Sequence, residues 1–339
     1  MSIRSLSTST LTQQKRYPAM SATEQLASGG NVEGPANGYY YHIFTESGDL
    51  NAIRNGTCEV LLIAGGGGGG GTGGSSAGGG GAGGLILTAV NLTPGSYSIV
   101  IGDGGANGGL ASTTNGSNGG DSTFAGLTAK GGGGGSAQNG TAQTGGSGGG
   151  GGDNNGSAAG ADPLGLLTTS VALSDGIGEQ GHAGSSSNGG NNAGGGGGGA
   201  GSPGRDAGAS GDWKIDNEHA GSDTYYGLRS QGGMGKRLDD WGADVDALTT
   251  GIFESRTWTG ISGSDYTGYW IASGGSGGND GSSGPVTGAL GGGATSAGQG
   301  ASVPALDALA NSGGGGGGGA DNNTGSDGAT GVCIVRYRL

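Results

Sequence analysis

The chain has 339 residues, of which 95 are glycine and only 7 are proline. This composition excludes collagen, which needs abundant proline and glycine at every third position. It also leaves too few large apolar side chains for the core of an ordinary enzyme of this length. The 13 basic and 26 acidic residues give a net charge of −13, so we expect no binding to nucleic acid, which requires a basic surface.

Residues 1–36 are polar and rich in serine and threonine. They contain no apolar stretch of the kind found in secretory signals, and no run in the sequence is long enough to span a membrane. We therefore expect synthesis in the cytoplasm without membrane insertion. The segment is either a disordered terminus or an anchor that docks onto a partner. The docking residues in the second case are Leu6, Leu11, Lys15, Arg16 and Tyr17.

Residues 37–339 contain short runs of apolar and β-branched side chains, which are typical of strands. Glycine-rich stretches separate these runs, and several glycine tracts begin directly after one of them. The expected strands are Tyr39–Phe44, Cys58–Ile63, Leu85–Val90, Ser96–Ile101, Ser122–Lys130 and Val332–Leu339.

Three further local features follow from the pattern. Thr93-Pro94-Gly95 has the residues of a tight turn, which predicts a β-hairpin between the strand before it and the strand after it. Weak helix patterns cover Arg237–Leu248 and Ala301–Ala310. Cys58 and Cys333 lie in the first and last strands of the glycine-rich part; we expect two buried thiols, with a disulfide as the alternative.

Uninterrupted glycine tracts, such as Gly65–Gly71 and Gly313–Gly319, are the main feature of the sequence. Ordering a residue costs about 1–2 kcal/mol, and glycine loses the most conformational freedom. Only backbone hydrogen bonds and close packing between neighbouring tracts can offset that cost here. Extended helices with three residues per turn allow both, provided that no Cβ holds them apart. The sequence therefore predicts a mainly β fold: a small sandwich of short strands combined with packed polyglycine-II helices and long loops.

The order of these elements resembles the glycine-rich domain of tailed-bacteriophage tail fibres, receptor-binding adhesins and related virion proteins. The resemblance covers about residues 40–339. It implies a non-enzymatic virion protein in which loops joining the glycine helices meet the host. The matching stretches are CEVLLIAGGGGGGG (58–71), GGGGAGGLILTAVNLTPGSYSIVIGDGGANGG (78–109), GGDSTFAGLTAKGGGGG (119–135) and GGGGGGGADNNTGSDGATGVCIVRYRL (313–339).

Residues 203–272 depart from that pattern and look like an insertion of ordinary composition. They contain all four tryptophans of the chain. Tryptophan and tyrosine provide large, rigid contact surfaces, so we interpret the segment as a recognition surface, with a small local core as the alternative. The candidate binding residues are Trp213, Tyr225, Tyr226, Trp241, Trp258, Tyr266, Tyr269 and Trp270.

Catalytic and metal-binding motifs are weak. The three histidines are far apart in sequence, and GxGxxG matches carry no information in a chain so rich in glycine. Asp153 and Asp321 follow glycine tracts, as in calcium-binding β-rolls, but they suit turns better. We expect no enzyme, no cofactor and no metal.

The resulting functional expectation is a virion component of a tail fibre or adhesin that binds a host surface receptor or glycan. Its partners would be other virion proteins. The chain would be either a trimer, as in many phage fibres, or a monomer, as in adhesin tips of this kind. The alternative is a capsid decoration or head-fibre protein anchored through residues 1–36.

Overall fold

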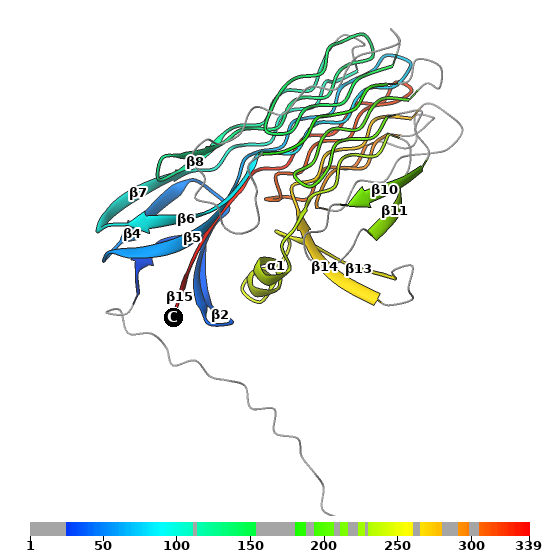
Figure 1. The fold of residues 1–339 in the computed structure, drawn as a ribbon. Coiled ribbons are helices and arrows are strands. Elements are labelled where there is room, and N and C mark those ends of the chain that lie inside the picture. The colour runs from blue at the N-terminus through cyan, green and yellow to red at the C-terminus, as the bar shows by residue number, and fades with distance from the viewer. Residues whose placement is uncertain are drawn as a thin grey trace, which may run out of the picture.

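The computed structural model describes residues 25–110, 114–153, 180–187, 193–206, 211–215, 223–227, 230–259, 265–279, 291–297 and 305–339. Strands are the main regular elements in these ranges, and the helix found there, α1, spans only Asp239–Asp246. The predicted mainly β class is confirmed. Figure 1 shows two sheets at one end of the molecule and a bundle of extended segments that runs away from them.

The larger part of the core belongs to a five-stranded antiparallel sheet in the order β2-β3-β15-β5-β6. Its central strand, β15, comes from the carboxyl-terminal end of the chain and pairs with strands from the amino-terminal part. Four expected strands lie here and are confirmed. The bounds are β2 Val32–Ala36, β3 Tyr39–Phe44, β5 Gly56–Ile63, β6 Leu85–Leu92 and β15 Val332–Arg338.

A second five-stranded antiparallel sheet has the order β1-β4-β7-β8-β9. Apolar side chains from both sheets, including Leu50, Val60, Phe124 and Val335, share one buried cluster. β1 and β2 fall within residues 1–36, so the end of the expected docking segment contributes strands to both sheets. The bounds are β1 Ala27–Ser28, β4 Gly48–Ala52, β7 Gly95–Val100, β8 Ser122–Phe124 and β9 Leu127–Ala129.

Residues 203–272 contribute two smaller sheets and the helix. β12, β14 and β13 form a three-stranded sheet in that order, and β10 pairs with β11. Helix α1 lies within the expected range Arg237–Leu248, and the helix prediction there is confirmed. The strand bounds are β10 Gly211–Ile215, β11 Asp223–Gly227, β12 Lys236–Arg237, β13 Glu254–Thr259 and β14 Asp265–Ile271.

The turn at Thr93 and Pro94 does not close a hairpin, so that prediction is wrong. β6 pairs with β5 in one sheet, whereas β7 pairs with β4 and β8 in the other. The turn therefore carries the chain from one layer of the sandwich to the other. A tight turn has the same local sequence in both arrangements, and only the distribution of partners distinguishes them.

Two other local predictions are corrected. The expected strand Ser122–Lys130 is a hairpin of β8 and β9, in which Ala125 and Gly126 both adopt positive φ (47° and 83°). Positive φ at both central residues is what a two-residue hairpin loop requires, because the backbone twist of the loop then matches that of the flanking strands. Residues 305–310, the described part of the weak helix pattern Ala301–Ala310, contain no helix.

Both cysteines are buried free thiols, which confirms the preferred expectation and excludes the disulfide alternative. β5 and β15 are neighbours, as anticipated, but Cys333 stands opposite Leu62 in the ladder, four residues along β5 from Cys58. Burial raises the pKa of the Cys58 thiol to about 12. Both thiols are therefore protonated at neutral pH.

The tract Gly65–Gly71 is buried and hydrogen-bonded along its whole length. N–H groups three residues apart donate to the same neighbouring segment. This period of three is the one expected for a helix with three residues per turn. Its carbonyl groups follow the same rule toward three further segments, so six segments surround the tract. Gly65, Gly68 and Gly71 donate to 114–120, Gly66 and Gly69 to 326–329, and Gly67 and Gly70 to 78–81, while carbonyls accept from 105–108, 132–135 and 316–319.

Close approach explains why these tracts contain so little but glycine. A Cβ added at Gly65 would overlap with the carbonyl of Asp103, and one added at Gly66 with that of Gly314. One added at Gly67 would overlap with Gly133. Each separation is shorter than the 3.0 Å that real Cβ atoms keep, and the obstructing atoms belong to hydrogen-bonded backbone. A side chain at any of these positions must push two tracts apart.

Candidate functional site

Helix α1 packs against the outer face of the first sheet, away from the second sheet. Trp241 and Val245 from the helix share a buried cluster with Ile43 of β3 and Leu61 of β5. Asp239 in the first helical turn accepts hydrogen bonds from the Tyr269 backbone N–H (3.0 Å) and the Arg237 side chain (2.9 Å). Acidic groups stabilise the positive end of the helix dipole. The helix is thus fixed both to the sheet and to β14.

Arg336 of β15 connects this helix to the sheet. Its guanidinium carbon lies 3.9 Å from the centre of the Trp241 ring and 4.3 Å from that of Tyr39. Its Nε donates to a carboxylate oxygen of Glu59 at 2.7 Å. Because Arg336 is only 8% exposed, its charge needs these partners. The guanidinium is therefore held between two aromatic rings, one from the sheet and one from the helix.

Tyr41 extends the same network toward the helix. Arg336 Nη1 donates to the Tyr41 hydroxyl at 3.1 Å, and that hydroxyl donates to Asp244 of α1 at 2.6 Å. Burial, together with the hydrogen bond to Asp244, raises the pKa of Tyr41 well above its usual value. The phenol thus stays protonated and donates to the carboxylate. The network therefore fixes helix α1, which belongs to residues 203–272, to the first sheet.

Three of the aromatic residues singled out from the sequence have described side chains. Trp241 and Trp270 are buried, with 5% and 1% exposure, and Tyr269 is half-buried against the same cluster. These residues form the local core that the sequence left open as an alternative to a recognition surface. Trp270 in β14 pairs with Glu254 of β13 and Arg237 of β12 in the three-stranded sheet.

The other five aromatic candidates occupy two antiparallel ribbons. In the β10–β11 ribbon, Trp213 stands opposite Tyr225, and Tyr226 follows it in β11. In the β13–β14 ribbon, Trp258 stands opposite Tyr266. Their side chains lie outside the described part of the structure, so their binding role stays a prediction. The expected docking residues also lie outside the described residues: Leu6, Leu11, Lys15, Arg16 and Tyr17.

The turns at the far end of the glycine bundle are polar and held by side-chain hydrogen bonds. After the tract Gly65–Gly71, the Thr72 hydroxyl accepts from the Ser75 N–H (3.0 Å), and the Ser75 hydroxyl donates to Asp153 (3.1 Å). Burial raises the pKa of Asp153. Asp321 has a positive φ of 45° and donates its N–H to the Ser75 carbonyl. Asp153 and Asp321 are thus turn residues, as predicted.

Neither metal-binding groups nor membrane-spanning helices emerge in the described ranges. No set of three or more His, Cys, Asp or Glu side chains there is arranged to hold a metal ion. No helix within them is long and apolar enough to cross a membrane.

The network around Arg336 was not predicted from the sequence. A detectable sign of it was an arginine inside the otherwise apolar run VCIVRYR. A charge in a central strand needs a buried partner, but Tyr41 and Glu59 lie almost 300 positions away in β3 and β5, and Trp241 lies in helix α1. A single sequence does not reveal that pairing.

Comparison with protein families gives one match over most of the chain. A family model described as a glycine-rich domain matches residues 45–338. The match includes residues 203–272, which the sequence pattern had suggested as an insertion. No curated protein matches the sequence.

Proposed function

This chain belongs to the glycine-rich domain family, and we propose that it is a non-enzymatic virion protein of a tailed bacteriophage. Its role would be that of a tail-fibre or adhesin component which binds the host cell surface. The proposal rests first on the order of strands and glycine tracts, which resembles that of phage adhesins. It rests secondly on the backbone hydrogen bonds that tie the glycine tracts into a bundle.

The hydrogen-bonded surroundings of Gly65–Gly71 are the observation that carries the proposal. We interpret the tracts as polyglycine-II helices. In Gly65–Gly71, the N–H groups of residues three positions apart donate to the same neighbouring segment, and the C=O groups accept hydrogen bonds with the same period of three. At ~3.1 Å per residue, a seven-residue tract spans about 22 Å. A bundle tied together in this way is a stiff spacer that holds the turns at its far end at a fixed distance from the sheets.

Binding rather than chemistry suits such an arrangement. The far-end turns offer hydroxyl, amide and carboxylate groups, and the ribbons β10–β11 and β13–β14 carry the aromatic residues that remain candidates for recognition. Aromatic faces stack on sugar rings, and polar turns provide hydrogen bonds to hydroxyl groups. A host-surface glycan is therefore the receptor class that we propose.

Immunogold electron microscopy of intact particles tests the location. We expect antibody raised against the purified chain to label fibre or tail tips, with pre-immune antibody as the control. Label distributed over the head would contradict the proposal, because it would identify a capsid decoration or head-fibre protein.

A competition assay tests the function. Purified chain should block adsorption of particles to host cells, and the double substitution Trp258→Ala and Tyr266→Ala should weaken this inhibition about tenfold or more. Ile53→Ala removes an exposed apolar side chain (52% exposed) near the sheet end and provides the control. Full-strength inhibition by the double variant would contradict a recognition role for these residues.

A further inference from the structure

Residues 25–29 fasten the amino-terminal end of the domain to both sheets. They contain β1, whose two residues pair with β4 in the second sheet. Leu26 and Ala27 are buried in the cluster that the two sheets share. The chain enters the domain here from residues 1–24, which include the docking residues expected from the sequence. We refer to residues 25–29 as the amino-terminal clasp.

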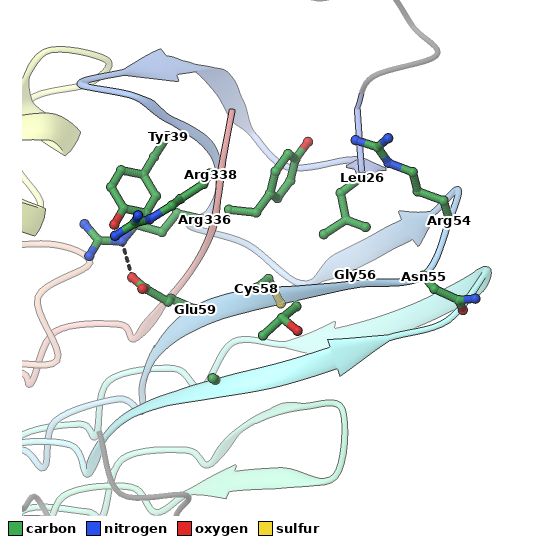
Figure 2. A pocket seen from close by; sticks show the side chains of 12 residues that line it. Leu26, Tyr39, Arg54, Asn55, Gly56, Cys58, Glu59, Arg336 and Arg338 are labelled. Carbon is green, nitrogen blue, oxygen red and sulfur yellow. Dashed lines mark hydrogen bonds and ion pairs between the residues drawn. The ribbon is translucent and has the colours of Figure 1, made fainter. Parts of the chain in front are cut away.

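The amino-terminal clasp has fewer backbone pairs than the strands around it. β1 pairs with β4 over two residues, whereas β5 pairs with β6 over eight. A cavity of about 450 Å³ adjoins the clasp, and Leu26 and Tyr337 are among the residues that line it (Figure 2). Segments with few contacts open before the rest of a folded protein. The clasp is therefore a part of the domain that can open while both sheets stay folded.

The imidazole of His42 in β3 joins the clasp to the first sheet. It is fully buried (0% exposed), its Nδ1 lies 2.7 Å from the Gly29 carbonyl oxygen, and its Nε2 lies 3.3 Å from the Tyr337 hydroxyl of β15. A carbonyl oxygen only accepts hydrogen bonds, so Nδ1 carries the proton of the neutral ring and donates to that oxygen. Nε2 then accepts from the Tyr337 hydroxyl. The neutral imidazole thus satisfies both contacts.

The Tyr337 hydroxyl has no capacity for a further donor. Its oxygen accepts hydrogen bonds from the backbone N–H groups of Leu26 and Ala27, which occupy both of its lone pairs. Its own proton is donated to His42. A second proton on His42 would therefore direct an N–H group at an oxygen that cannot accept it. One of the contacts that hold the clasp must break when the imidazole becomes charged.

Glu33 of β2 places a negative charge beside this imidazole. It stands opposite His42 in the sheet, with one carboxylate oxygen 3.6 Å from Nδ1, and the other accepts from the Gly29 N–H at 2.9 Å. Tyr40 of β3 and Tyr337 of β15 lie against the ring, with centres 5.3 and 5.7 Å away. Burial raises the pKa of both phenols, so neither is charged at neutral pH.

Charged groups on the neighbouring elements face elsewhere. Residues 25–29 contain no charged side chain. Asp49 of β4 is exposed on the outer face of the second sheet, and Arg336 and Glu59 lie on the helix side of the first sheet. Burial lowers the pKa of His42 from 6.5, although Glu33 raises it. The closed clasp thus excludes a proton that the hydrated ring of an open clasp accepts, and acid favours opening.

We propose that the amino-terminal clasp is an acid-sensitive switch: protonation of His42 opens residues 25–29 while the two sheets stay folded. Asn31 secures the chain beyond the clasp. Its backbone N–H donates to the Ile43 carbonyl, and its side-chain oxygen accepts from the Thr45 N–H, both at 2.8 Å. Opening therefore ends at residue 30. The freed residues would lengthen the connection to residues 1–24 by up to about 20 Å, so acid would extend the reach of the expected docking segment.

Amide hydrogen exchange of the full chain at about pH 7.5 and about pH 5, read by mass spectrometry, tests the switch. Each rate is compared with that of the unfolded chain at the same pH, which removes the intrinsic effect of pH on exchange. We expect protection of residues 25–30 to fall at least about fivefold in acid. It should also stay at least about tenfold below that of β5 at both pH values, because the clasp opens without the sheets.

Three variants identify the group that responds to acid. His42→Gln retains an amide donor and acceptor but cannot gain a proton, so protection of the clasp should change less than about twofold with pH. Glu33→Gln removes the carboxylate that favours the charged imidazole and should move the response to lower pH, which keeps the test available if His42→Gln does not fold. His182→Gln replaces a half-buried histidine outside the clasp and is the control, with the response of the unsubstituted chain. Circular dichroism at both pH values establishes folding.

Three results would overturn the proposal. They are equal protection of residues 25–30 at the two pH values, the same fall in folded His42→Gln as in the unsubstituted chain, and equal protection of the clasp and β5 in acid. The third would show that the clasp opens only when the whole domain unfolds. The inference goes beyond the proposed function, and its failure would leave immunogold labelling at the fibre tips unaffected.

Discussion

Replacing Gly69 with alanine tests whether close backbone packing dictates the glycine tracts. Gly69 lies in the middle of the buried tract Gly65–Gly71, and a Cβ there would overlap with the carbonyl of Gly317. The obstructing atoms are backbone, so no side chain can rotate out of the way. Gly48→Ala is the matched control, because its Cβ would meet only the Phe44 ring at 3.7 Å, an ordinary contact.

The expected loss in the free energy of unfolding follows from the separation of the tract around Gly69 from the tract around Gly317. Separating the two tracts breaks the hydrogen bonds from the Gly316 N–H to the Gly67 carbonyl and from the Gly319 N–H to the Gly70 carbonyl (2.8 and 3.0 Å). Each bond contributes about 0.5–1.5 kcal/mol, and overpacking costs about 1–3 kcal/mol. The stiffer unfolded chain offsets about 0.4–1 kcal/mol. For Gly69→Ala we expect a decrease of about 2–5 kcal/mol in the free energy of unfolding.

Urea unfolding followed by circular dichroism measures this loss. Gly48→Ala should stay within about 0.5 kcal/mol of the unsubstituted chain. A Gly69→Ala variant equally close to the unsubstituted chain would refute the reasoning, because it would show that the tracts have room for a side chain.

Three further predictions concern buried polar groups. Arg336→Met should lower the free energy of unfolding by about 2–4 kcal/mol in urea titrations, because it leaves Glu59 without its ion pair; an unchanged midpoint would contradict the network. Burial lowers the pKa of His42 from 6.5, so the unfolded state binds more protons near pH 6, and stability should fall as pH drops below about 6.5. His42→Gln should weaken that dependence, and identical pH profiles for the two chains would contradict it. A thiol reagent such as Ellman's should label Cys58 and Cys333 only after denaturation, because both are buried and protonated; rapid labelling of the native chain would show otherwise.

Local patterns predicted those elements whose structure depends on their own residues. Tyr39–Phe44 and Val332–Leu339 are β-branched and aromatic runs, and each forms a strand close to the expected bounds. Helix α1 also follows from its pattern. Glycine tracts have no side chains to bury, so the sequence predicted backbone hydrogen bonds between neighbouring tracts. The hydrogen bonds around Gly65–Gly71 repeat every three residues, as expected.

Features that depend on distant partners were not predictable. Thr93 and Pro94 form a turn in either a hairpin or a crossover, and the partner strands β4 and β5 decide between them. A positive φ, as at Ala125, is unusual for a residue other than glycine. The sequence therefore gave no strong indication of the β8–β9 hairpin. Trp241 is likewise buried against residues of other elements, including Ile43 of β3 and Leu61 of β5, and its ring lies under Arg336 of β15.

Amide hydrogen exchange of the native chain, read by mass spectrometry on peptides covering Gly65–Gly71, tests most directly whether the glycine tracts are ordered spacers. In the structure, every N–H group of this tract is hydrogen-bonded in a buried environment. We predict exchange at least about 100-fold slower than in the unfolded chain, comparable to strands β5 and β15. Exchange at the unfolded rate in the tract, with those strands protected, would contradict the account and show that the glycine runs are flexible linkers.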